Sequence, residues 1–149
     1  MTIQFLDSRT SELSNTNTGT GILPVSPALL VGDIGLQVAL VIGTPNEADV
    51  RIELWGTLGV SGTAADTVTI TIERGGTATP GTGTVIYTAS PDLLTGDNLL
   101  TFHAADFHPA IPASGQLRYT MFAAHTGGEP AVTITGPVAF SGIAQAGAI

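Results

Sequence analysis

The chain has 149 residues, no cysteine and a formal net charge of −8, with 12 acidic residues against 4 basic ones. The lack of cysteine excludes disulfides, thiolate metal sites and cysteine nucleophiles, and the scarcity of basic residues excludes a basic patch for nucleic acid. No apolar run reaches the roughly 18 residues of a membrane helix, and no basic region precedes an apolar stretch at the start. Neither a membrane partner nor a signal peptide is therefore expected.

Residues 1–31 differ in composition from the rest of the chain. After a short apolar tip they are rich in Ser, Thr and Asn, with Leu13 as an isolated apolar residue, which predicts a flexible arm. The arm is either a disordered tail or a tether whose tip docks on a neighbouring subunit. Because Pro24 and Pro27 follow, the lead-in predicts at most an edge segment, and we place the folded domain at residues 32–149. The apolar tip consists of Ile3, Phe5 and Leu6.

Residues 50–60 carry the strongest strand pattern of the chain. Apolar and polar residues alternate over most of this stretch, which places the apolar set on one face of a β-strand. Gly56 and Gly59 interrupt the pattern and predict a bend, a bulge or a close backbone approach. The single tryptophan, Trp55, lies on the face opposite the apolar set. We therefore expect that face to be covered by another sheet or another subunit.

Strand patterns separated by turn residues recur along the rest of the domain. In residues 67–74, for example, three β-branched apolar residues alternate with polar ones. The chain predicts about eight strands, and no helix beyond a single turn at residues 90–94. We expect an all-β fold, an antiparallel jelly-roll β-sandwich, with a closed barrel as the alternative. The other predicted strands are residues 35–42, 84–89, 99–107, 117–124, 132–135 and 138–144.

Three histidines offer a candidate metal site. His103 and His108 flank Asp106, and His125 comes from the next predicted strand. Along a strand, however, residues 103 and 108 point to opposite faces, so structural histidines explain the pattern better. We expect no metal and no cofactor.

The sequence carries no catalytic signature. The acidic pairs Glu47 with Asp49 and Asp92 with Asp97 fall in predicted turns, where carboxylates usually cap the backbone or are solvated. A calcium site in these turns would lack the ligand pattern of known calcium loops. No nucleophile motif of the form G-x-S-x-G occurs, and the glycine-rich segment at residues 75–83 lacks the lysine and the following helix of a phosphate loop. We expect that the protein is not an enzyme.

The low charge of the chain points to self-association. Charged residues make up 11% of the sequence, compared with about 25% in ordinary soluble domains. A chain with so few charges needs to bury apolar surface, and association with copies of itself is the plainest way to do so. We expect a homo-oligomer, either a trimer or a fibre. The residues predicted to form its interface are Ile3, Phe5, Leu6, Trp55, Phe122 and Phe140.

The closing segment TITGPVAFSGIA, at residues 133–144, is similar to the end of small exosporium proteins of spore-forming bacilli, of the kind called exosporium protein C. A long strand at residues 51–60, followed by IERG at 72–75 and GTVIYT at 83–88, resembles the same proteins. More distantly, the module resembles the jelly-roll heads of collagen-like spore filaments, which are similar to tumour-necrosis-factor and C1q trimers, although this chain has no Gly-X-Y repeat. The resemblance implies a structural protein of the spore surface and supplies no site residues.

Two classes of function follow from the sequence. The first is a structural, self-assembling surface protein of the bacterial spore envelope, in the exosporium or a spore appendage, with other spore-surface proteins as further partners. The alternative is a ligand-binding jelly-roll module, either lectin-like or a fibre-head receptor binder. The mass of the protein in solution separates them, because a stable assembly without ligand favours the first.

Overall fold

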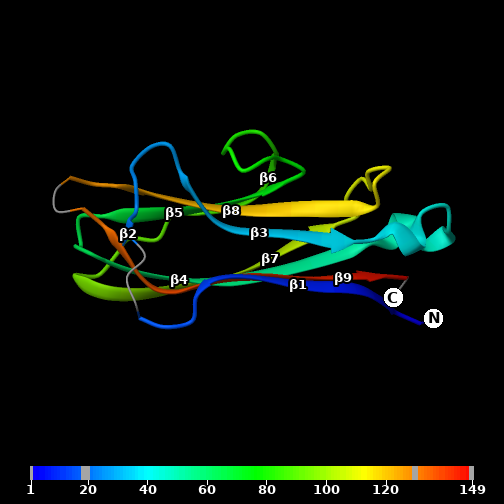
Figure 1. Cartoon of the computed structure of the whole chain (residues 1–149), viewed down its shortest axis with the longest axis horizontal. Helices are drawn as coiled ribbons and strands as arrows, with labels where there is room; N and C mark the ends of the chain where they lie inside the picture. Colours follow the sequence, from blue (N-terminus) through cyan, green and yellow to red (C-terminus); the bar gives the residue numbers. More distant parts are fainter. Residues whose placement is uncertain (1, 18–20, 129–130, 148–149) are drawn as a thin grey trace.

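The computed structural model describes residues 2–17, 21–128 and 131–147, which form two antiparallel β-sheets stacked as a sandwich (Figure 1). One sheet has the order β1-β9-β4-β7, with β2 also pairing with β9, and the other has the order β3-β8-β5-β6. The all-β jelly-roll sandwich is confirmed, and two separate sheets replace the closed barrel. The strands are β1 (Gln4–Ser14), β2 (Gly21–Ile22), β3 (Leu29–Gln37), β4 (Arg51–Gly62), β5 (Thr67–Arg74), β6 (Thr84–Ala89), β7 (Gly96–Phe107), β8 (Gln116–Thr126) and β9 (Thr133–Ala146).

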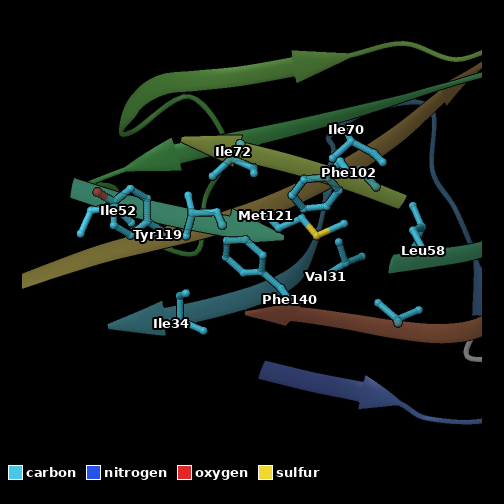
Figure 2. Packing of buried hydrophobic residues seen from close by; sticks show 14 of the residues in the cluster. Val31, Ile34, Ile52, Leu58, Ile70, Ile72, Phe102, Tyr119, Met121 and Phe140 are labelled. Atoms are coloured by element: carbon cyan, nitrogen blue, oxygen red, sulfur yellow. The ribbon is translucent and has the colours of Figure 1, made fainter. Parts of the chain in front are cut away.

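Alternation along β4 decides which side chains enter the core. Ile52 and Leu54 point between the two sheets and are fully buried, whereas Glu53 and Trp55 point away from the core. Figure 2 shows how such inward side chains from both sheets meet, with Phe140 of β9 lying close to Met121 of β8. Burying each large apolar side chain contributes about 1.5–3 kcal/mol relative to leaving it exposed, so this shared layer holds the two sheets together.

The apolar run predicted as a strand at residues 35–42 has a different structure. β3 ends at Gln37, and Ala39–Val41 forms a short 3-10 helix, followed by a second one at Pro45–Asp49. Val38 and Val41 are fully buried in the core cluster, so this run packs against the core instead of extending the strand. Within the described residues, no helix is long and apolar enough to cross a membrane.

β9 runs without a break through the position where two separate strands were predicted. The pairing of β4 with β9 shifts register between Leu58 and Val60, where Gly59 alone stands opposite a bulge of β9 that includes Gly136 and Pro137. Gly59 sits at the bulge, and a Cβ atom on it would overlap the carbonyl group of Gly136. The close backbone approach predicted from the sequence is therefore confirmed at Gly59.

Replacing Gly59 with alanine is expected to lower the free energy of unfolding by about 2–3 kcal/mol, because the added methyl group meets backbone that cannot rotate away. Equilibrium unfolding in urea measures the change. Gly128→Ala is the matched control, since a Cβ atom there has nothing within 4 Å. Equal stability of the two variants would contradict the close approach at Gly59.

The residues expected to form a flexible arm begin with a strand. β1 pairs with the edge of β9 from Gln4 opposite Ala146 to Ser14 opposite Val138, and Leu6 packs partly against the core. Composition predicted disorder because β1 has few apolar residues to bury, but the edge of β9 supplies backbone hydrogen-bond partners that composition does not reveal. The folded domain therefore begins at β1 and not at residue 32.

Asp7 links β1 to β3 of the other sheet through a hydrogen bond. Its carboxylate accepts hydrogen bonds from the backbone N–H of Gln37 in β3, at 2.9 Å, and from Arg9 Nε, also at 2.9 Å. Partial burial of Asp7 raises its pKa, but these bonds outweigh burial and hold the pKa below its usual value. The carboxylate therefore stabilises the attachment above the unfolded-state pKa near 3.8, and this contribution is lost as the pH falls through the lowered pKa.

We accordingly expect β1 to open more readily below about pH 4. The measurement is hydrogen exchange of the β1 amides, corrected for the intrinsic effect of pH on exchange. Asp7→Asn, which cannot titrate, is the control and should remove this part of the pH dependence. If both proteins show the same dependence, Asp7 does not hold the strand.

Candidate self-association surface

The outward side of the β1-β9-β4-β7 sheet is broad and carries few charges. The strand register places its side chains in rows across the sheet, and we call this surface the β1–β7 face. Its charged residues are Glu12, Arg51, Glu53 and Asp97. The other members are Phe5, Ser8, Thr10, Pro137, Ala139, Ser141, Ile143, Gln145, Trp55, Thr57, Leu99, Thr101, His103, Ala105 and Phe107.

Large apolar side chains on this face remain open to solvent. Phe5 is 62% exposed, Phe107 63%, Leu99 60% and Trp55 38%. Phe5 and Phe107 lie at opposite ends of one row, with Gln145 and Arg51 between them. The four apolar side chains are therefore spread over the face and separated by polar residues.

Arg51 adds an electrostatic feature to the same row. One guanidinium nitrogen, Nη2, is shielded from solvent and has no hydrogen-bond partner among the described residues. An uncompensated, shielded donor is costly in a low-dielectric environment. The carboxylates of Glu53 and Glu12 lie on the same face.

The six residues predicted to form the interface fall into two groups. Ile3 is 51% exposed, and Phe5 and Trp55 lie on the β1–β7 face, while Leu6 packs partly against the core. The second group is enclosed within the subunit: Phe140 is 0% and Phe122 1% exposed. These two aromatic rings already contact their own chain, so they are removed from the proposed interface.

The sequence analysis missed Phe107, Leu99 and Ile143, which belong to the β1–β7 face. The alternation within residues 99–107 could have shown that Leu99 and Phe107 share one side of a strand. It could not show that β7 pairs with β4, where Trp55 stands opposite His103. Pairing between the strands places side chains from β1, β9, β4 and β7 on one surface.

The candidate metal residues are not brought together. In β7 the Asp106 side chain points inward, whereas His103 and His108 are exposed. His125 lies in the other sheet, where its Nδ1 is 4.0 Å from Asp66 Oδ1 and both side chains are buried. Across the ranges that the structure describes, no group of three or more potential ligands could hold a metal ion.

One residue of each acidic pair accepts a hydrogen bond from a nearby backbone or hydroxyl group. Glu47 Oε2 accepts a 2.6 Å hydrogen bond from the backbone N–H of Gly43. Asp92 Oδ1 accepts a 2.7 Å bond from the Thr67 hydroxyl. These contacts match the capping role predicted for carboxylates in turns.

A buried polar network that was not predicted joins the two sheets. Asp106 of β7 accepts hydrogen bonds from Arg74 Nη1 of β5, at 2.8 and 2.6 Å, and from the Tyr119 hydroxyl of β8, at 2.9 Å. Burial, together with the negative charge of Asp106, raises the pKa of Tyr119 far above its usual value. Tyr119 therefore stays protonated and acts as a donor in this network.

A hollow beside this network is lined by two of the four arginines, Arg74 and Arg118. Arg118 pairs with both carboxylate oxygens of Asp33, at 3.0 and 2.6 Å, and Arg74 pairs with Asp106. Both positive charges are thus compensated within the chain, and the hollow offers no unpaired charge to an anionic ligand.

Comparison with known proteins identifies no family for the chain. No protein-family model matches the chain, and no curated protein is significantly similar to it. Among solved structures, the chain is similar to the Eiger tumour necrosis factor of S. frugiperda, with a TM-score of 0.49 and 12% identity over 94% of this chain and 92% of that one. It is also similar to the VP2 subviral particle of infectious bursal disease virus, with a TM-score of 0.47 and 14% identity over 94% of this chain. The chain spans about a third of that capsid chain, 32%, and both likenesses concern the jelly-roll fold alone.

Proposed function

We propose that the protein is a structural, self-assembling surface protein whose copies associate through the β1–β7 face, and that it does not act as an enzyme. The observation that carries this proposal is the low-charge face itself, with Phe5, Trp55, Leu99 and Phe107 exposed on it. Burial of such side chains between subunits supplies the hydrophobic driving force of association.

The dimensions of the face suit a stable interface. Four strands at about 4.8 Å spacing give a width of about 19 Å, and 12 residues at about 3.3 Å give a length of about 40 Å. The resulting area of about 750 Å² is close to the roughly 800 Å² that each partner buries in a standard specific interface. The face is therefore large enough to hold an assembly together without a ligand.

The charges on the β1–β7 face allow a second copy of this chain to be the occupant. Each copy carries a formal net charge of −8, so two copies repel one another wherever their acidic residues approach. On the β1–β7 face Arg51 partly offsets the acidic residues Glu12, Glu53 and Asp97, and the remaining members are uncharged. Copies that meet through this face bring few like charges together.

The finer proposal places the assembly in the spore envelope, in the exosporium or a spore appendage. It rests on the resemblance of residues 133–144 to exosporium protein C. In the structure these residues belong to β9, which contributes Ala139, Ser141 and Ile143 to the β1–β7 face. The segment that carries the resemblance is thus part of the proposed interface. We propose a trimer or a fibre, with other spore-surface proteins as further partners.

Light scattering on the purified protein at micromolar concentration tests the assembly. We expect a mass that is a multiple of the 15.1 kDa subunit, without any added ligand. A monodisperse monomer would overturn the proposal, and glycan binding by that monomer would favour a lectin-like module instead. Immunogold labelling of intact spores of the source organism tests the location, since label confined to other cell structures would contradict it.

A further inference from the structure

β1 depends less on the core than the other long strands do. It is the terminal strand of its sheet, and its pairing with β9 is interrupted by two register shifts, one at Leu6 and one at Leu13. Leu6 packs partly against the core, whereas Phe5 is 62% exposed and Leu13 51%. Backbone hydrogen bonds to the edge of β9, more than apolar burial, therefore hold β1 in place.

The side-chain contacts of β1 are polar and few. The Asp7 carboxylate accepts from the Gln37 N–H at 2.9 Å, and the Ser11 hydroxyl accepts from the Asp33 N–H at 3.2 Å. Both contacts join β1 to β3 of the other sheet. Hydrogen bonds of this kind exchange readily with water, so β1 can leave its edge without opening the core between the sheets.

The connection between β1 and β2, when extended, is longer than the distance between the β9 residues with which its two ends pair. From Ser14 to Gly21 there are seven Cα steps, which extend to at most about 25 Å. Ser14 pairs with Val138 and Gly21 pairs with Ile134. These two β9 residues are four positions apart, or about 13 Å along a strand. The chain between β1 and β2 therefore has enough length to direct β1 away from its own subunit.

We propose that β1 exchanges between subunits, so that β1 of one copy pairs with the β9 edge of a second copy; this proposal rests on the self-assembly proposed above. A second copy is the occupant because its β9 and β3 offer β1 the same backbone and side-chain partners that its own subunit offers. Exchange of an identical element therefore loses no contacts. Repeated exchange in one direction links copies into a ring or a fibre.

Engineered disulfides test the exchange, because the natural chain has no cysteine. In the double variant Thr10→Cys with Ser141→Cys, the two cysteines replace hydroxyl groups of β1 and β9 that lie 3.0 Å apart. We expect mild oxidation of the assembled protein to yield covalent dimers and larger species on a non-reducing denaturing gel. The matched control is Thr57→Cys with Thr101→Cys, two residues that stand opposite each other in β4 and β7 on the same face. That pair lies within one subunit and should yield only monomers.

An assembly of unchanged mass in which every Thr10–Ser141 disulfide is intramolecular would overturn the exchange and leave the proposed self-assembly intact. A monomer by light scattering would instead overturn the self-assembly, and the exchange with it. Should the first pair fold poorly, Ser8→Cys with Ile143→Cys repeats the measurement, since these two residues also stand opposite each other in β1 and β9. Intersubunit disulfides in either pair, with monomers in the control, are the expected result.

Discussion

Replacing Asp106 with alanine is expected to lower the free energy of unfolding by about 3 kcal/mol or more. Asp106 accepts two hydrogen bonds from Arg74 and one from Tyr119, and these three residues come from strands in both sheets. Removing the carboxylate leaves a guanidinium that is only 24% exposed without its counter-ion. An unpaired charge in such a place costs more than the loss of one hydrogen bond, because water can solvate it only in part. Urea unfolding monitored by circular dichroism gives the change.

Two further variants separate the ion pair from the hydrogen bond. Tyr119→Phe removes one bond to a charged acceptor and keeps the Arg74–Asp106 pair, so a cost of about 1.5–3 kcal/mol is expected. Asp92→Ala removes an exposed carboxylate that binds the Thr67 hydroxyl and should stay within about 0.5 kcal/mol of the natural protein. A loss for Asp106→Ala no larger than that for Asp92→Ala would show that the network does not stabilise the sandwich.

The period of two in the sequence was enough to predict an all-β sandwich and the inward side of most strands. It failed at β8, where Tyr119 and Met121 enter the core between the sheets while Thr120 and Phe122 on the other side are also buried. A strand buried on both sides has no alternation that distinguishes core from surface. Phe122 was therefore predicted at an interface although its own subunit encloses it.

Features that depend on contacts between distant segments could not be predicted from the sequence. The glycine-rich loop at residues 75–83 was predicted only as an irregular connection. In the structure the Glu73 carboxylate is 2% exposed and accepts hydrogen bonds from the backbone N–H groups of Gly81, at 2.6 Å, and Gly83, at 3.0 Å. A register shift between Ile72 and Glu73 accompanies this arrangement. Neither composition nor periodicity shows which carboxylate will bind a loop. The pairing of β1 with the edge of β9 could not be predicted for the same reason.

A negative charge on the β1–β7 face is expected to dissociate the assembly. Thr101 is exposed on β7 and stands opposite Thr57 of β4, next to the row that contains Trp55. If copies pack through this face, Thr101→Asp places an unpaired carboxylate in a desolvated contact, at a cost of about 2–5 kcal/mol. The dissociation constant should then rise at least about 30-fold. Light scattering over a dilution series measures the change.

Thr88→Asp is the matched control, because Thr88 is also an exposed strand threonine but lies on β6 of the other sheet. Both variants change the net charge of the chain by the same amount, so general repulsion between copies affects them equally. Only Thr101→Asp should lose assembly, while the two variants keep similar unfolding midpoints because neither site is in the core. If Thr88→Asp dissociates the assembly and Thr101→Asp does not, copies associate through the β3-β8-β5-β6 sheet, and the β1–β7 face is not the interface.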